Sequence, residues 1–235
     1  METKRSTTVR WTAVAAVAVA VIAIGGFFGH RAYASHKATA AGCSRVEEWK
    51  QETSPYLKIG DGPRTTAILG DSYSAGDDLT DRADGWVYGY AALTGERVLV
   101  NSVGYTGYVA GGYCGDDQFI TRADAVADAS PDRVIVQGGL NDVGSNLDEV
   151  SRAASQLVDE FEDTTEVILI GPPHAPQRAA GEKAVDGVLR EVAADAHVKY
   201  VSAYSWDLEY NDEGLHLTER GHAEFAENVT AALAE

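Results

Sequence analysis

Short β-branched runs alternate with longer segments of helical apolar spacing from Pro63 to the C-terminus. A strand buried on both faces reads as a short continuous apolar run, whereas an amphipathic helix repeats apolar residues every three or four positions. The alternation of the two predicts parallel strands joined by crossover helices. The strands are predicted over Thr66–Leu69, Val98–Asn101, Val134–Gln137, Val167–Ile170 and Val198–Val201.

Three segments have the spacing of amphipathic helices. The first is Leu147–Phe161, and Ser145 with Asp148 offers it an N-terminal start. The others are Val185–Val192 and the C-terminal Phe225–Leu233. Together these elements predict an α/β fold, a three-layer α/β/α sandwich with a five-stranded parallel sheet of the flavodoxin-like kind. Right-handed crossovers bring the loops that follow the strands to one edge of that sheet.

The N-terminal part of the chain has a different character. Three basic residues precede the uncharged run Trp11–Phe28, which as a helix spans about 27 Å, near the ~30 Å of a bilayer core. Ala32–Ala34 resembles a signal peptidase site, but the run is longer than the roughly 7–15 residues of a signal-peptide core. We predict a signal peptide or an N-terminal membrane anchor over residues 1–34, with the rest of the chain outside the cytoplasm.

Residues 35–62 read as a linker or lead-in with one short helix near Val46–Trp49, and residues 63–235 as the folded domain. The chain has two cysteines, Cys43 and Cys114. In an oxidising compartment such a pair is most simply one disulfide, which would stabilise the fold by roughly 4 kcal/mol on the chain-entropy model.

The composition of the chain argues against some classes of binding partner. The formal net charge of −17 argues against nucleic acid and against broad adhesion to anionic lipid, because both require clustered Lys and Arg. No pattern of closely spaced His, Cys or Glu residues indicates a metal site, and no glycine-rich phosphate loop follows a strand. We expect no metal and no cofactor, and a monomer.

Polar residues and glycines that could take part in catalysis follow three of the predicted strands. Gly70-Asp71-Ser72 ends the first strand, Val103–Gly107 follows the second, and Gly139–Asp142 follows the third. His216 lies just before the C-terminal helix. Parallel strands end at one edge, so these blocks are expected to converge.

In this order the four blocks resemble the SGNH (GDSL-type) hydrolase family of esterases, lipases and deacetylases. The resemblance runs from about Pro63 to the C-terminus. It implies that Ser72 is the nucleophile, and that the oxyanion hole consists of the Ser72 and Gly107 amides and the Asn141 side chain. Gly104 competes with Gly107 for that role. The substrate implied is a small-molecule, glycan or lipid ester.

The resemblance assigns the general base to His216, whose imidazole needs a partner to hold its tautomer. The family usually has Asp three residues before this histidine, where this chain has Glu213. Asp212 lies one residue earlier. The spacing favours Glu213, with Asp212 or a backbone carbonyl as alternatives.

The sequence leaves three activities open. The first is a carboxylic ester hydrolase that works through a Ser72 acyl-enzyme. The second is an acyltransferase that passes the acyl group to a sugar hydroxyl. The third is a catalytically inactive carbohydrate- or lipid-binding module on the same fold.

Overall fold

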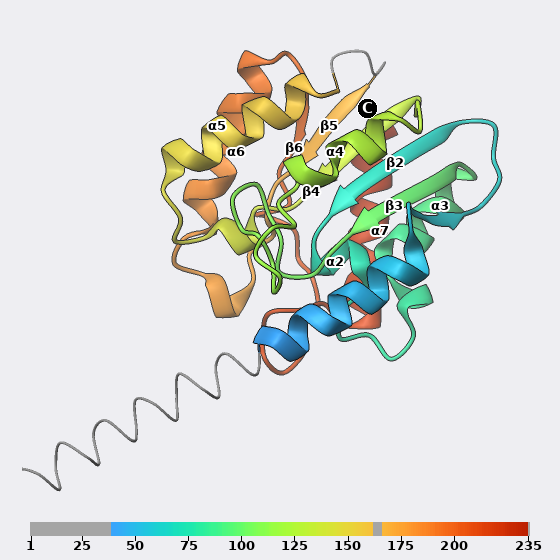
Figure 1. Ribbon diagram of the computed structural model, residues 1–235, viewed down its shortest axis with the longest axis horizontal. Coiled ribbons are helices and arrows are strands. Elements are labelled where there is room, and N and C mark those ends of the chain that lie inside the picture. Colours follow the sequence, from blue (N-terminus) through green and yellow to red (C-terminus); the bar gives the residue numbers. More distant parts are fainter. Residues whose placement is uncertain (1–38, 162–165, 235) are drawn as a thin grey trace, which may run out of the picture. The chain divides into compact units, whose positions relative to one another are not determined.

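One six-stranded sheet forms the centre of the compact unit Arg45–Glu235 (Figure 1). The computed structural model describes residues 39–161 and 166–234. The strand order is β1-β3-β2-β4-β5-β6, with β2 to β6 parallel and β1 antiparallel to β3. The strands are β1 (Leu57–Ile59), β2 (Thr65–Gly70), β3 (Arg97–Ser102), β4 (Arg133–Gln137), β5 (Val167–Ile170) and β6 (Lys199–Val201).

The five predicted parallel strands are confirmed, and β3-β2-β4-β5-β6 is the flavodoxin-like order. The edge strand β1 is the difference, because it lies in the segment predicted as lead-in. It has only three residues and pairs antiparallel with Val98–Val100. A strand this short contains too little alternation to be recognised from the sequence.

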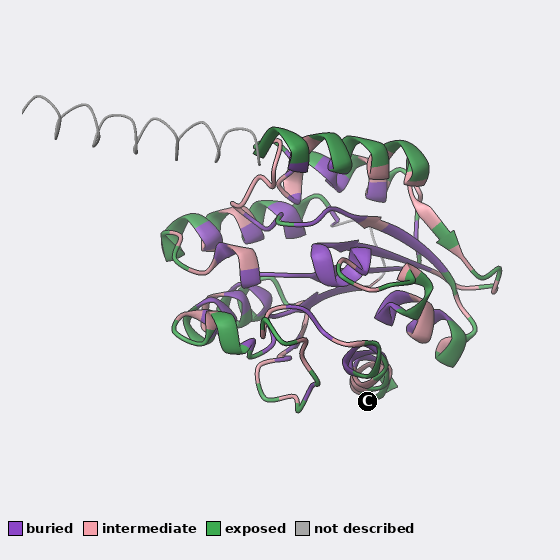
Figure 2. Ribbon diagram, turned by 90° about the horizontal axis from the view of Figure 1, so that it is seen from below, coloured by how far each residue is buried: buried purple, intermediate pink, exposed green. Residues whose placement is uncertain are grey.

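Helices cover both faces of the sheet, as predicted for a three-layer sandwich. Helices α4, α5 and α6 pack on one face, and α3 and α7 pack on the other. Figure 2 shows buried residues along the sheet and exposed residues on the outer sides of the helices. The helices are α2 (Ser72–Ala75), α3 (Trp86–Thr94), α4 (Ile120–Ala127), α5 (Leu147–Asp159), α6 (Glu182–Asp195) and α7 (Glu219–Ala234); the short 3-10 turns are η1 (Arg82–Asp84), η2 (Leu140–Asp142) and η3 (Pro176–Arg178).

Side-chain alternation along β2 divides the core between the two layers. Ala67 and Leu69 join the cluster under α4, α5 and α6, while Ile68 joins the cluster under α3 and α7. All three are fully buried, which explains the continuous apolar run in the sequence. On the α3–α7 side, Trp86 and Phe225 pack with ring centroids 5.2 Å apart.

Capping side chains fix where two helices begin. The N-cap of α5 is Asn146, whose Oδ1 accepts the amides of Asp148 and Glu149, so the start lies one residue beyond the predicted Ser145. At α7, the Thr218 hydroxyl accepts the Gly221 amide. This cap ends the loop that carries His216.

The lead-in is more ordered than predicted, since residues 39–53 are helical. From Arg45 onward it belongs to the same compact unit as the sheet, and the Trp49 Nε1–H donates to the Ser102 carbonyl at 2.7 Å. Both cysteines are disulfide-bonded, which confirms the predicted Cys43–Cys114 bridge. The described residues include no helix that is both long and apolar enough to span a membrane. The predicted leader or anchor, residues 1–34, lies outside the described residues.

Candidate active site

Ser72 is the first residue of α2, directly after the carboxyl end of β2. Asp71 caps this short helix, and its buried carboxylate accepts the Tyr73 amide at 3.0 Å. This turn lifts the Ser72 hydroxyl to the sheet edge while the residue stays mostly buried. The sequence therefore places the hydroxyl where loops from other strands can reach it.

His216 lies against that hydroxyl. Its Nε2 is 3.1 Å from Ser72 Oγ, within hydrogen-bond distance for proton transfer. Tyr73 supports the contact from the next position of α2, because its hydroxyl donates to the Leu215 carbonyl and its ring packs 6.1 Å from the imidazole. The structure thus brings together Ser72 and His216, which are 144 residues apart in the chain.

The other imidazole nitrogen faces an acid that sequence reasoning missed. Asp78 Oδ2 lies 2.6 Å from His216 Nδ1, although it does not lie along the Nδ1–H direction. Neither predicted acid is there: Glu213 and Asp212 are both exposed, and neither has an ion pair or hydrogen bond with His216. A turn separates both acids from the histidine, so the predicted role of Glu213 or Asp212 has no contact with His216 to support it.

The two glycines considered for the oxyanion hole, Gly107 and Gly104, have different surroundings. The Gly107 amide is already used, since it donates to the Ala110 carbonyl at 2.9 Å. A Cβ at Gly107 would meet the Asp142 carboxylate at 2.3 Å, so this glycine makes room for that acid. Gly104 instead lies against the nucleophile, because a Cβ there would be 3.8 Å from the Ser72 Cβ. Within residues 39–161 and 166–234 the Gly104 amide has no internal acceptor.

Asn141 remains a candidate donor. Its Nδ2 donates one hydrogen bond to the Thr106 carbonyl at 2.9 Å, which leaves the second N–H of the amide for a substrate oxygen. The neighbouring Asp142 is fully buried and accepts the amides of Tyr108, Val109 and Ala110 at 2.9–3.0 Å. Asp142 therefore ties the Asn141 turn to the loop after β3.

Two ionisable groups near the site have strongly shifted pKa values. Burial raises the pKa of Asp71 to about 7, against the hydrogen bond from the Tyr73 amide. Burial, with a smaller contribution from His216, lowers the pKa of His222 to about 4. His222 Nδ1 accepts the Trp86 amide, so a neutral imidazole suits its position.

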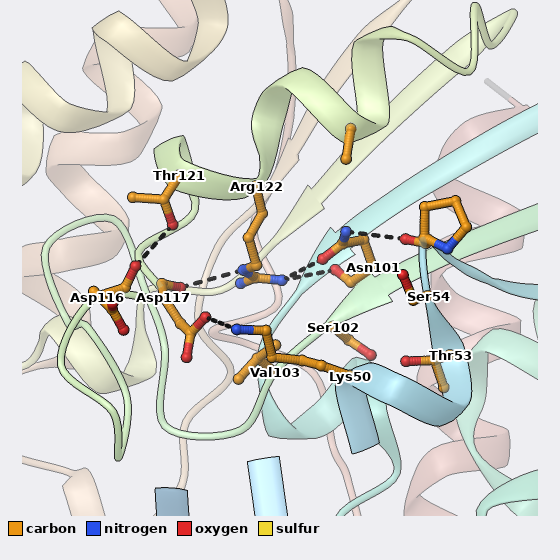
Figure 3. A pocket seen from close by; sticks show the side chains of 12 residues that line it. Lys50, Thr53, Ser54, Asn101, Ser102, Val103, Asp116, Asp117, Thr121 and Arg122 are labelled. Carbon is orange, nitrogen blue, oxygen red and sulfur yellow. Dashed lines mark hydrogen bonds and ion pairs between the residues drawn. The ribbon is translucent and has the colours of Figure 1, made fainter. Parts of the chain in front are cut away.

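The buried Arg122 side chain lies hydrogen-bonded between Asn101 and Asp117 (Figure 3). Arg122 is buried and donates to the Gly70 carbonyl, the Thr106 hydroxyl and both oxygens of Asn101. Beside it, Lys50 binds Asp117 at 2.8 Å. Arg122, Asn101, Lys50 and Asp117 line a pocket of about 350 Å³ that neither Ser72 nor His216 lines.

The Lys50 ammonium also lies beside a group of three side chains that could in principle bind a metal ion. Glu47, Cys114 and Asp117 lie within 4.8 Å of one another. The Cys114 sulfur is in a disulfide, and Lys50 Nζ contacts both carboxylates. Because the sulfur is in a disulfide and both acids are paired with Lys50, these three residues do not suit a metal ion.

The profile of the GDSL-like lipase/acylhydrolase family matches residues 68–224, which is more than half of the chain and includes Ser72, Asn141 and His216. The chain belongs to the GDSL-like lipase/acylhydrolase family. As a member of this family it is a carboxylic ester hydrolase. A comparison with the curated proteins finds no match.

Solved structures of two esterases share the fold. A carbohydrate acetylesterase from Sinorhizobium meliloti is 17% identical, with a TM-score of 0.62 over 73% of this chain and 98% of that one. An acetylxylan esterase from Geobacillus stearothermophilus is 16% identical, with a TM-score of 0.60 over 76% of this chain and 97% of that one. At these identities the likeness concerns the fold alone.

Proposed function

We propose that this GDSL-like enzyme hydrolyses carboxylic esters through an acyl-enzyme on Ser72. The observation that carries the proposal is the 3.1 Å contact between Ser72 Oγ and His216 Nε2. In the first step His216 takes the hydroxyl proton while Oγ bonds to the ester carbonyl carbon. The imidazolium then returns the proton to the leaving alkoxide as the carbon–oxygen bond breaks.

Water completes the cycle by the reverse chemistry. His216 takes a proton from water, the resulting hydroxide bonds to the acyl carbon, and the Ser72 oxygen leaves with that proton. The oxyanion that forms in both halves needs donors already in place. The amides of Ser72 and Gly104 and the second N–H of Asn141 are the donors that we assign, with Gly104 in place of the predicted Gly107.

The substrate we propose is an acylated sugar or another small polar ester. Support comes from the acetylesterases among the structural neighbours. We further propose that the enzyme works outside the cytoplasm, either secreted or held by its N-terminal segment. The disulfide and the basic-then-apolar N-terminus support this location.

Replacement of the nucleophile tests the proposal. Ser72→Ala should lower kcat on p-nitrophenyl acetate by several orders of magnitude, with an unchanged melting temperature within a few degrees. A fluorophosphonate probe should label the native enzyme at Ser72 and leave the variant unlabelled. Ser74→Ala is the matched control on the same helix, since the Ser74 hydroxyl bonds Gln137 and not His216.

The outcomes separate the three activities. Turnover by folded Ser72→Ala at the native rate would contradict the proposal. Native protein that takes up the acyl group but releases it only when a sugar acceptor is added would indicate an acyltransferase. A native protein that the probe does not label would indicate a binding module.

A further inference from the structure

We infer that Asp78 is the residue that positions His216, in place of an acid on the histidine's own loop. The inference rests on the proposed role of His216 as general base. It assigns the third member of the catalytic group to the loop that follows the nucleophile helix. The nucleophile and the acid then come from one continuous segment, and the base comes from another.

The short distance between the Asp78 carboxylate and the His216 imidazole supports this assignment. Asp78 Oδ2 is 2.6 Å from His216 Nδ1, and the opposite nitrogen of the same ring faces Ser72 Oγ at 3.1 Å. The imidazole therefore lies between the hydroxyl and the carboxylate, the arrangement that holds a proton on Nδ1 and leaves Nε2 as acceptor. The Asp78 side chain is 53% exposed, so its carboxylate can rotate onto the Nδ1–H direction without disturbing the core.

The alternatives from the histidine loop are directed elsewhere. The Gly214 amide donates to the Asn211 carbonyl, and the Asn211 amide donates to the His216 carbonyl, both at 2.9 Å. These bonds close a turn that leaves the Asp212 and Glu213 side chains exposed to solvent. Across the described ranges no backbone carbonyl accepts from His216 Nδ1, so the backbone alternative also lacks a partner.

Several contacts hold Asp78 in place relative to Ser72. Helix α2 ends at Gly76 in the left-handed conformation, and the Asp77 amide then donates back to the Ser72 carbonyl at 3.0 Å. Asp77 is paired with Arg82 at 2.8 Å, and the Arg82 guanidinium lies 4.3 Å from the centre of the Trp49 ring. Asp78 itself has a φ of 68°, in the left-handed region.

The other ionisable groups near the imidazole do not fill this role. Asp77 is directed at Arg82, and burial raises its pKa. His222 is neutral in the working range because burial lowers its pKa to about 4. Tyr73 donates its hydroxyl proton to Leu215.

Asp78→Asn tests the inference with little change in backbone preference, because Asn and Asp both tolerate a positive φ. We expect kcat on p-nitrophenyl acetate to fall by about 10²–10⁴-fold, as loss of the acid does in serine proteases, with KM changed by less than about threefold. Asp78→Glu should recover part of the lost kcat.

Glu213→Gln and Asp212→Asn are the matched controls, and both should keep kcat within about threefold of the native value because solvated acids contribute little. Native kcat in Asp78→Asn, or an equal loss in Glu213→Gln, would overturn the inference. The proposed function fails separately, because only Ser72→Ala and probe labelling test the nucleophile.

Discussion

A buried carboxylate lies directly beside the nucleophile, and burial raises the pKa of Asp71 to about 7. One oxygen of Asp71 accepts the Tyr73 amide at 3.0 Å, and the Gln137 side chain, like that amide, lowers the pKa of the carboxyl without cancelling the effect of burial. The acid that caps the helix of Ser72 therefore lowers the stability of the folded protein when it ionises. An N-cap needs only an acceptor oxygen, and a neutral amide supplies one.

The raised pKa of Asp71 predicts a pH-dependent effect of Asp71→Asn on stability. The folded pKa lies above the ordinary value of ~3.9, so folding retains a proton that the unfolded chain releases. The stability of the native protein should fall as pH rises from about 4 to about 7. Asp71→Asn removes this loss, so its melting temperature should exceed the native one at pH 8, and the gap should shrink by pH 5.

Asp81→Asn is the matched control for that measurement. Asp81 caps η1 by accepting the Ala83 amide, as Asp71 caps α2, but its side chain is exposed. Calorimetry should show no pH-dependent gap for Asp81→Asn. An Asp71→Asn protein that is less stable than the native protein at pH 8 would show that the ionised carboxylate stabilises the turn.

At the scale of elements, the loop between β3 and α4 contains two glycines with different tasks. Gly104 packs against Ser72, and its amide has no acceptor in the part of the chain that the structure describes. Gly107 instead makes space for the Asp142 carboxylate, which binds three amides of the same loop. Arg122 ties this loop to the end of β2, because it donates to the Thr106 hydroxyl and to the Gly70 carbonyl. The loop is therefore fixed from both sides before a substrate arrives.

The two glycines predict contrasting effects of an added methyl group. In Gly104→Ala the Cβ would meet the Asp77 carboxylate end at 2.2 Å, so the loop must shift beside Ser72; kcat should fall by about 10-fold or more, with a modest change in stability. In Gly107→Ala the Cβ collides with Asp142, and the melting temperature should fall by several degrees. Equal kcat losses in both folded variants would place the oxyanion donor in doubt.

At the scale of the whole molecule, the disulfide closes a long stretch of chain that includes β1, β2, β3 and α3. Such a bridge restricts the unfolded chain and should stabilise the native state by roughly 4 kcal/mol. Unreduced enzyme should show no free thiol in denaturant. Reduction should lower its melting temperature, and the Cys43→Ser/Cys114→Ser double variant should show the same loss without a reductant.

Two titratable thiols in unreduced enzyme would contradict the bridge. A melting temperature that reduction leaves unchanged would show that the unfolded chain is restricted by other means. The double variant also serves as the control for side effects of the reductant.

The sequence predicted features that follow from local pattern and missed those that depend on distant contacts. Apolar runs identified β2 to β6, and motif order selected Ser72 and His216, which lie in contact, because each pattern is encoded within a few neighbouring residues. Asp78 has no such signal, since its contact with His216 joins two separate loops. Gly104 and Gly107 differ only in what surrounds them, and β1 is too short to show alternation.

The segment that begins at Ser72 and ends at Asp78 joins nucleophile and acid in one peptide. Both residues are therefore contained in one short segment of the chain. The loop before His216 need not supply a carboxylate, so its sequence can vary more freely. A classifier that requires an acid three residues before the histidine would accept this enzyme on account of Glu213 and misassign its mechanism. Relatives with no acid on that loop would be discarded as inactive, although an aspartate after the nucleophile helix could serve them equally well.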